Sequence, residues 1–218
     1  MADRYFVEHK VDSDRIVLGP PEGHHLARVM RAQPGDAVTL FDGSGAEFAA
    51  TVERVGRDEV ELAIRERHEV DRELPLRLVL AVALPKGDRQ KWLVEKCVEL
   101  GVTALVPLRS ERGVAQPADS ALARLRRSVI EATKQCGRNR LMEIAEAEKW
   151  SDFAANAARE TLRLVAQPGA KLSILAACRS AHSEQAADLS EICIAVGPEG
   201  GFSDSEFDTA LAHGWQGV

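Results

Sequence analysis

Residues 192–206 read ICIAVGPEGGFSDSE, an apolar run followed by a glycine-rich loop and a helix start. The run 192–196 suits a strand buried on both faces. Ser203 with Glu206 three residues later is typical of a capping box, which opens a helix. In parallel sheets, ligands bind at the carboxyl ends of the strands. The stretch therefore predicts a strand, a ligand-binding loop and a helix.

The glycines of this loop allow a ligand to approach the backbone without interference from Cβ atoms. The loop matches neither the GxGxxG nucleotide pattern nor a phosphate loop with GK[ST]. Its free N–H and C=O groups suit an adenine edge. A simple tight turn between strand and helix is the alternative.

The chain around this loop alternates strands with helices after Pro75, which indicates an α/β domain with a parallel sheet covered on both faces. Helices are predicted over 89–100, with Asp88 as cap, and over 120–136. In the first helix Leu93, Cys97 and Leu100 form one apolar stripe, with Val94 and Val98 beside it. The predicted strands are 76–84, 102–108, 172–177 and 192–196.

The first 70 residues have a different pattern, with short strands and tight turns such as the hairpin loop 42–45. This pattern predicts a small β-barrel. The charged stretch 66–75 ends in a proline and separates the two patterns. We therefore predict two domains, 1–72 and 73–218.

Composition is that of an ordinary globular protein, with 45% hydrophobic and 28% charged residues and no span long enough to cross a bilayer. The net charge of −6 argues weakly against a nucleic-acid partner, but residues 117–140 hold six basic residues against two acidic ones. A basic face of this kind can bind phosphates, and a solvated helix face is the alternative. The four cysteines form no CxxC pair, so Cys97, Cys136 and Cys193 are predicted to be buried, and no metal site is expected.

Three further groups of polar residues are candidate sites. Glu131 and Gln135 share a helix face, and Arg138 follows the glycine that ends the helix. A polar site there competes with a surface pair. Lys86 and Arg89 follow the first strand of the sheet and could meet phosphate, or could simply be surface charges on a capped helix. The third group, in the first domain, could contact RNA or be ordinary surface residues: Arg4, His24, His25, Arg28 and Arg31.

Taken together, these motifs resemble one family, the bacterial small-subunit ribosomal RNA uridine-N3 methyltransferases (RsmE) of the SPOUT superfamily. The similarity runs in order along nearly the whole chain. The matching segments are RYF 4–6, HHLARVMR 24–31, PGD 34–36, KGDRQKWLVEKCVELGV 86–102, ER 111–112, EATKQCGR 131–138 and VGPEGGFSDSE 196–206.

The resemblance implies a PUA-like barrel that helps to hold RNA, followed by a SPOUT domain with a trefoil knot that binds S-adenosylmethionine. It also implies a homodimer. The sequence itself, without an apolar signal core or a membrane-spanning run, predicts a cytoplasmic protein with no membrane or metal partner. The implied substrate is a uridine of 16S rRNA in the small ribosomal subunit. The family continues past the last helix with a Leu-Gly-x-Arg-Ile-Leu-Arg segment, so the chain ending at Val218 is expected to lack its knot-closing segment.

Methyl transfer to uridine N3 would need the following residue roles, as a hypothesis. Arg138 would stabilise the uridine anion or grip the target nucleotide, Glu199 would act as base or hydrogen-bond the substrate, and Gln135 and Glu131 would orient the site. The cofactor would lie against Leu175, Val196, Gly197, Pro198, Glu199, Gly200 and Gly201. RNA would be held by Arg4, His24, His25, Arg31, Lys86, Arg89, Arg112, Arg124 and Arg127.

Three alternatives stay open at this point. One is a SPOUT methyltransferase acting on another RNA position, and a second is a non-catalytic rRNA-binding or assembly factor. A nicotinamide-dependent Rossmann enzyme is disfavoured because GxGxxG is missing after the first strand of the sheet domain.

Overall fold

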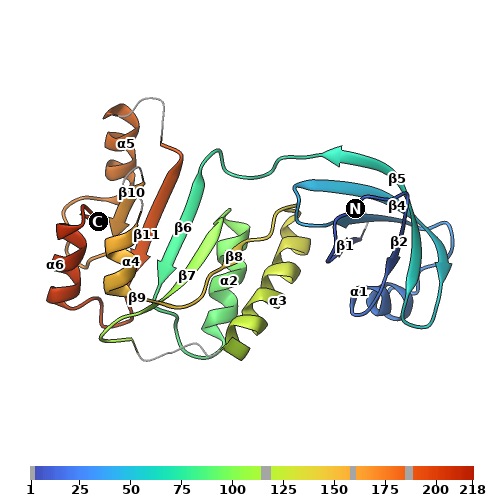
Figure 1. Cartoon of the computed structure of the whole chain (residues 1–218), viewed down its shortest axis with the longest axis horizontal. Helices are drawn as coiled ribbons and strands as arrows, with labels where there is room; N and C mark the ends of the chain where they lie inside the picture. The colour runs from blue at the N-terminus through green and yellow to red at the C-terminus, as the bar shows by residue number, and fades with distance from the viewer. Residues whose placement is uncertain (1–2, 114–118, 158–160, 185–188) are drawn as a thin grey trace. The chain divides into compact units, whose positions relative to one another are not determined.

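The computed structural model describes residues 3–113, 119–157, 161–184 and 189–218. The chain divides into two compact units (Figure 1). The first contains Met1–Glu73 and Ile130–Leu141, and the second contains Leu74–Val129 and Met142–Val218.

The first unit is built on a five-stranded sheet in the order β1-β3-β4-β5-β2. β1 runs parallel to β3, and the other neighbouring pairs are antiparallel. The β4–β5 pairing carries two register shifts, which bend an antiparallel ribbon. The strands are β1 (Arg4–Phe6), β2 (Arg15–Leu18), β3 (Ala37–Phe41), β4 (Ala46–Val55) and β5 (Val60–Glu69), and the helical turns are α1 (Glu22–His24) and the π-helix η1 (His25–Val29).

Burial in this sheet follows the two-residue period of a strand with one core face. In β4, Phe48, Ala50 and Val52 are buried, while the residues between them are partly exposed. They join Leu40 and Leu62 in the core of the first unit. The predicted small β domain is confirmed as a curled β-sheet, with the 42–45 hairpin loop in the expected place.

The second unit contains a parallel sheet in the order β12-β10-β11-β6-β7-β8, with β9 also paired to β7. All of its strand pairs are parallel, as the alternation of strands and helices predicts. The strands are β6 (Arg77–Val82), β7 (Ala104–Arg109), β8 (Glu143–Ile144), β9 (Glu148–Lys149), β10 (Leu162–Val165), β11 (Glu191–Val196) and β12 (Gln216–Gly217).

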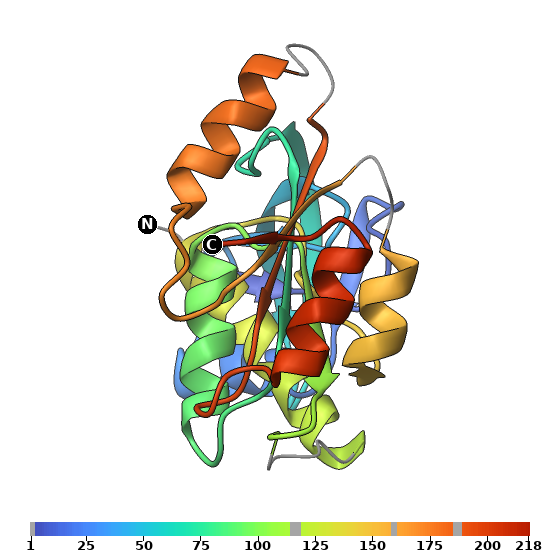
Figure 2. The same ribbon diagram turned by 90° about the vertical axis from the view of Figure 1, so that its left-hand side faces the viewer.

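Helices cover both faces of this sheet. Figure 2 shows α2 (Arg89–Glu99) and α5 (Ile174–Glu184) on one side, and α4 (Trp150–Asn156) and α6 (Asp204–Ala212) on the other. Trp150 stacks on Phe202 at 4.4 Å and meets Trp215 edge-on, so the α4 and α6 side has an aromatic core. The remaining helix, α3 (Asp119–Cys136), begins in the second unit and ends in the first.

The predicted strand over 172–177 is wrong, because α5 begins at Ile174. The Ser173 hydroxyl accepts a hydrogen bond from the Ala176 amide at 3.2 Å, and the Ser173 carbonyl accepts one from the Ala177 amide. A serine in this place satisfies the unpaired amides of a first helical turn. The sheet takes its strand from Leu162–Val165 instead.

The helix over 89–99 forms as predicted, but its buried face differs from the predicted stripe of Leu93, Cys97 and Leu100. Val94, Cys97 and Val98 are buried, whereas Leu100 is 71% exposed. Asp88 precedes the helix without a side-chain capping hydrogen bond. The predicted burial of Cys136 is also wrong, since that cysteine is exposed.

Candidate active site

The glycine loop leaves β11 at Val196 and enters α6 at Asp204. It turns tightly, with the Gly201 amide donating to the Pro198 carbonyl at 2.8 Å. A Cβ atom on Gly197 would lie 2.9 Å from the Phe202 amide nitrogen and 3.0 Å from the Gly201 carbonyl carbon. Gly201 has φ +69°, a conformation that favours glycine. The loop therefore requires glycine at both positions.

The far end of the loop is fixed by the predicted capping box. The Ser203 hydroxyl accepts from the Glu206 amide, and the Glu206 carboxylate accepts from the Ser203 amide at 2.9 Å. The other Glu206 oxygen accepts from the Glu111 amide at 2.8 Å. Phe202 is 2% exposed against Trp150. The loop backbone is thus held in one geometry before any ligand binds.

Arg112 also braces the loop. Its guanidinium donates to the Gly200 carbonyl at 2.8 Å and to the Phe202 carbonyl at 3.4 Å. The RNA contact expected of Arg112 stays a prediction, and within this unit its guanidinium contacts the loop backbone. This role was not visible in the sequence because 88 residues separate Arg112 from Gly200.

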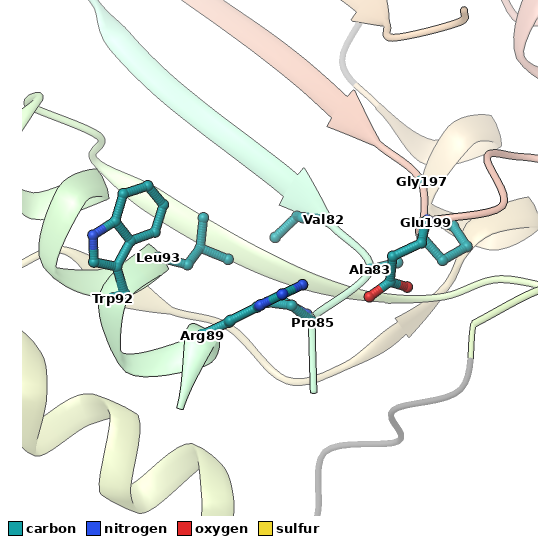
Figure 3. Close-up of a pocket in the computed structure, with 9 residues that line it drawn as sticks. Val82, Ala83, Pro85, Arg89, Trp92, Leu93, Gly197 and Glu199 are labelled. Carbon is teal, nitrogen blue, oxygen red and sulfur yellow. The ribbon is translucent and has the colours of Figure 1, made fainter. Parts of the chain in front are cut away.

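A pocket of about 550 Å³ opens beside the loop. Val82 and Val196 are register partners, so β6 and β11 end next to each other at the pocket. Figure 3 shows Gly197 and Glu199 at one side, Trp92 and Leu93 at the opposite side, and Arg89 between them. The full lining is Val82, Ala83, Pro85, Arg89, Trp92, Leu93, Gly197, Pro198 and Glu199. A mostly apolar pocket with a few polar groups is typical of small-molecule sites.

The predicted cofactor residues are only partly brought together. Gly197, Pro198 and Glu199 line the pocket, while Val196 ends the strand beneath it. Leu175 lies on α5, is 59% exposed, and is not part of the lining. Lys86 is exposed just after β6.

Arg138 lies in the first unit, where it is buried against Glu73. Its Nε donates to one Glu73 oxygen at 3.1 Å, and Nη2 donates to the other. Gln135 is exposed, and Glu131 is an exposed partner of Lys134 at 3.5 Å. The convergence of Glu131, Gln135 and Arg138 on one polar site therefore stays a prediction, and Glu199 belongs to the other unit.

An ion network surrounds the segment that contains Arg138. Arg4 donates to Glu47 at 2.9 Å, to the Asn139 side-chain oxygen at 2.6 Å and to the Arg138 carbonyl at 3.1 Å. Arg72 donates to Glu47 at 2.9 Å and to the Gly137 carbonyl at 3.0 Å. Sequence reasoning missed Glu47 and Glu73, because nothing local marks a carboxylate as the partner of an arginine 25 to 65 residues away.

The ion network around Glu47 should make the stability of the protein depend on pH. Hydrogen bonds from Arg72, and also from Arg4 and Asn139, hold the pKa of Glu47 at about 2, below the ordinary value of 4.5. A carboxylate with a lowered folded-state pKa contributes stability that is present above its unfolded pKa and is lost as the pH falls toward the folded value. The free energy of unfolding should therefore decline as the pH falls from 4.5 toward 2.

Urea denaturation over this pH range measures the effect, with Glu47→Gln as the variant that cannot titrate. Glu47→Gln should be less stable than the wild type at pH 7 and should show a shallower decline in acid. Equal acid slopes for the two proteins would contradict the assigned role of Glu47.

The other predicted RNA contacts of the first unit lie on and after its helical turns. His24 pairs with Asp58 at 2.9 Å, and the His25 ring lies 6.1 Å from that of Tyr5. Arg31 has φ +55°, a conformation uncommon for a residue other than glycine. Val29 and Met30 are exposed immediately before it.

The α3 arginines of the second unit differ in their partners. Arg126 donates to the Ile144 carbonyl at 3.0 Å and pairs with Glu146 at 2.8 Å. Arg124 and Arg127 are exposed, and their side chains make no hydrogen bond or ion pair within the ranges described above.

A parallel sheet with a glycine loop and a mostly apolar pocket at its strand ends is the arrangement at which α/β proteins commonly bind small molecules. Family comparison makes the class specific. The RNA methyltransferase domain family matches residues 72–218, and the RNA methyltransferase PUA domain family matches residues 18–65. The chain belongs to the RNA methyltransferase family.

Relatives and solved structures agree with this assignment. The chain is 34% identical over 204 residues to the ribosomal RNA small subunit methyltransferase E of Synechocystis, covering 93% of this chain and 65% of that protein. The Bacillus subtilis protein of the same name is 27% identical, with coverages of 94% and 83%. The family resemblance found in the motifs is thereby confirmed.

Two solved structures cover all of this chain and 88% of their own. One is the Neisseria gonorrhoeae ribosomal RNA small subunit methyltransferase E bound to S-adenosyl methionine, with 28% identity and a TM-score of 0.88. The other is a methyltransferase from Legionella pneumophila in complex with the same cofactor, with 30% identity and a TM-score of 0.86.

Proposed function

We propose that this protein transfers a methyl group from S-adenosylmethionine to N3 of a uridine in 16S rRNA. The observation that carries the proposal is the braced glycine loop at the end of β11, which borders a pocket at the carboxyl ends of two adjacent strands. The names of the relatives support the substrate class.

The pocket residues fit the cofactor. Gly197 and Gly201 allow the tight turn of the loop beside the pocket, and Val82, Ala83 and Pro198 supply an apolar wall. The cofactor contributes a methyl group on a positively charged sulfonium, and the Glu199 carboxylate in the lining complements that charge. We assign cofactor binding to Val196–Gly201 together with Val82 and Ala83.

The uracil N3–H must lose its proton as the N3–methyl bond forms and the sulfur–methyl bond breaks. Glu199 is the carboxylate of the pocket lining and is our choice for accepting that proton. Arg89, in the same lining, can donate to a uracil carbonyl as negative charge develops. The orienting roles of Glu131 and Gln135 stay predictions.

For Arg138, the contacts support a positioning role. Its guanidinium is committed to Glu73, and the adjacent carbonyls accept from Arg4 and Arg72. We propose that Arg138 anchors the end of α3 within the first unit. The anion-stabilising role predicted from the family motif would require it to leave this buried pair.

We assign RNA holding to the PUA-like domain, residues 1–72, and catalysis to residues 73–218. The candidate RNA contacts of the PUA-like domain are Arg4, His24, His25 and Arg31. Those of residues 73–218 are Lys86, Arg124 and Arg127. No helix in the described part of the chain has the length and apolar character to cross a bilayer. Action in the cytoplasm as a homodimer, and the trefoil knot, are further proposals from the family resemblance.

The α3 arginines make the RNA proposal testable. An Arg124→Ala, Arg127→Ala double variant should bind small ribosomal subunits more weakly, and the slope of log K against log salt should fall in magnitude by about 1 to 2. Arg126→Ala is the matched control on the same helix, because Arg126 is already paired with Glu146. Filter binding at several salt concentrations measures all three proteins. Equal slopes for the double variant and the wild type would remove α3 from the RNA interface.

Mass spectrometry of 16S rRNA from a strain lacking the gene tests the function as a whole. We expect one 3-methyluridine to disappear and to return when the gene is restored. An unchanged pattern would favour an assembly factor without catalytic activity, whereas loss of a different modified nucleotide would favour another RNA position.

A further inference from the structure

Trp92 differs from the other two tryptophans of the chain. Trp150 and Trp215 are 1% and 2% exposed, and their indole N–H groups donate to the carbonyls of Glu206 and Ala154. Trp92 is 61% exposed near the start of α2. An exposed indole leaves a large apolar face in water, and burying it against a flat partner would be favourable.

Trp92 also lies in the pocket of the glycine loop, at the opposite side from Gly197 and Glu199 (Figure 3). A methyl transferase must bring two ligands together in one cavity, the donor and the acceptor base. If the loop holds the donor, as proposed above, the α2 side is the part of the pocket left for the acceptor. This step rests on the proposed function.

The chemistry of the α2 side matches an unpaired pyrimidine. The indole offers a flat face on which a base can stack. Arg89 supplies donors for a uracil carbonyl, and Glu199 can accept from the imide N–H. Lys86 is exposed in the turn before α2 and can meet the attached phosphate. Arg89 in the lining and the exposed Lys86 nearby suit an anionic RNA strand.

We propose that Trp92 is the stacking platform for the target base and determines which nucleotide enters the pocket. A target reached in this way must be unpaired or turned out of its stack. Trp92 acts on the RNA and not on the cofactor, so the two ligands should respond differently to its substitution.

Tryptophan fluorescence gives a direct readout, because Trp92 is the exposed tryptophan of the three. The probe is a short uridine oligonucleotide, added with S-adenosylhomocysteine at saturation. We expect quenching in the wild type and none in Trp92→Phe. Oligonucleotide affinity, measured by anisotropy of a labelled strand, should fall about 10- to 100-fold in Trp92→Leu and only a few-fold in Trp92→Phe, which keeps a flat ring.

Leu100→Ala is the matched control, since Leu100 is exposed on the same helix and is not part of the pocket lining. It should leave oligonucleotide affinity unchanged. Quenching by the cofactor product alone, with weaker cofactor binding in Trp92→Leu, would assign the ring to the cofactor. Quenching that depends on protein concentration would assign it to a second copy. Either result overturns the proposal, as does an oligonucleotide that causes no quenching.

Methylation of small ribosomal subunits separates this proposal from the proposed function. If the wild type methylates them and Trp92→Leu does so with unchanged KM and kcat, only the role of Trp92 fails. If the wild type methylates no uridine, the proposed function itself fails.

Discussion

Replacing Gly197 with alanine is expected to weaken S-adenosylmethionine binding and to lower the rate of methyl transfer on the order of 100-fold, because a displacement of about 1 Å at a positioned group has effects of this size on the rate. The added Cβ would lie 2.9 Å from the Phe202 amide nitrogen and 3.0 Å from the Gly201 carbonyl carbon. Both are backbone atoms, so no side-chain rotation relieves the contact. The loop is braced by Arg112 and Glu206, and the strain must therefore displace the segment 197–201 itself.

Isothermal titration calorimetry measures this loss. Gly19→Ala is the control, because a Cβ on Gly19 meets nothing within 4 Å. Gly200→Ala should have an intermediate effect, since its Cβ would make only an ordinary 3.5 Å contact with the Arg112 side chain. Wild-type affinity in Gly197→Ala would show that the loop geometry is not needed for the cofactor.

Replacing Arg138 with methionine is expected to lower the free energy of unfolding by about 3 to 5 kcal/mol, the usual cost of removing one partner of a buried ion pair. Arg138 is 5% exposed, and the methionine would leave the Glu73 carboxylate without its bidentate donor. The same change weakens the attachment of the α3 end to the first unit, which Arg4 and Arg72 otherwise hold through backbone carbonyls.

Urea denaturation compares the stability of Arg138→Met, which loses one partner of the ion pair, with that of the Arg138→Met, Glu73→Met double variant, which loses both. The double variant should recover much of the stability, because no buried charge is left unpaired. Arg140→Met is the control at an exposed arginine two residues away, and should change stability by about 0.5 kcal/mol or less. A folded, fully stable Arg138→Met protein that fails to methylate RNA would support the anion-stabilising role instead.

The parallel sheet could be predicted because its central strands are continuous apolar runs. The segments 76–84 and 192–196 became β6 and β11, and the Ser203–Glu206 capping box formed as expected. Local rules decide these features, so the sequence alone carries the information. The position of the glycine loop could also be predicted, because the loop directly follows one of these apolar runs.

The errors occurred where local rules give two answers. The run 172–177 is short and apolar, a pattern that periodicity cannot assign to strand or helix, and Ser173 decides for the helix. Leu100 was predicted to be buried because it shares a stripe with Cys97, but the buried face is defined by Val94 and Val98.

The site was harder to predict than the fold, because its contacts join distant segments. Glu47 and Glu73 reach Arg4, Arg72 and Arg138 only through the folded chain. Trp92 could have been noticed from the sequence, since it lies on the polar face of a helix between Arg89 and Lys96. An aromatic residue in such a position is a candidate for ligand contact.

A crystal structure of this protein grown with S-adenosylmethionine tests most directly whether the β11 loop is the methyl-donor site. We expect cofactor density against the main chain of Val196–Gly201, with the sulfonium on the side of Glu199 and the adjoining wall formed by Val82 and Ala83. Cofactor density elsewhere in the protein, with the loop making no contact to it, would show that the β11 loop is not the methyl-donor site.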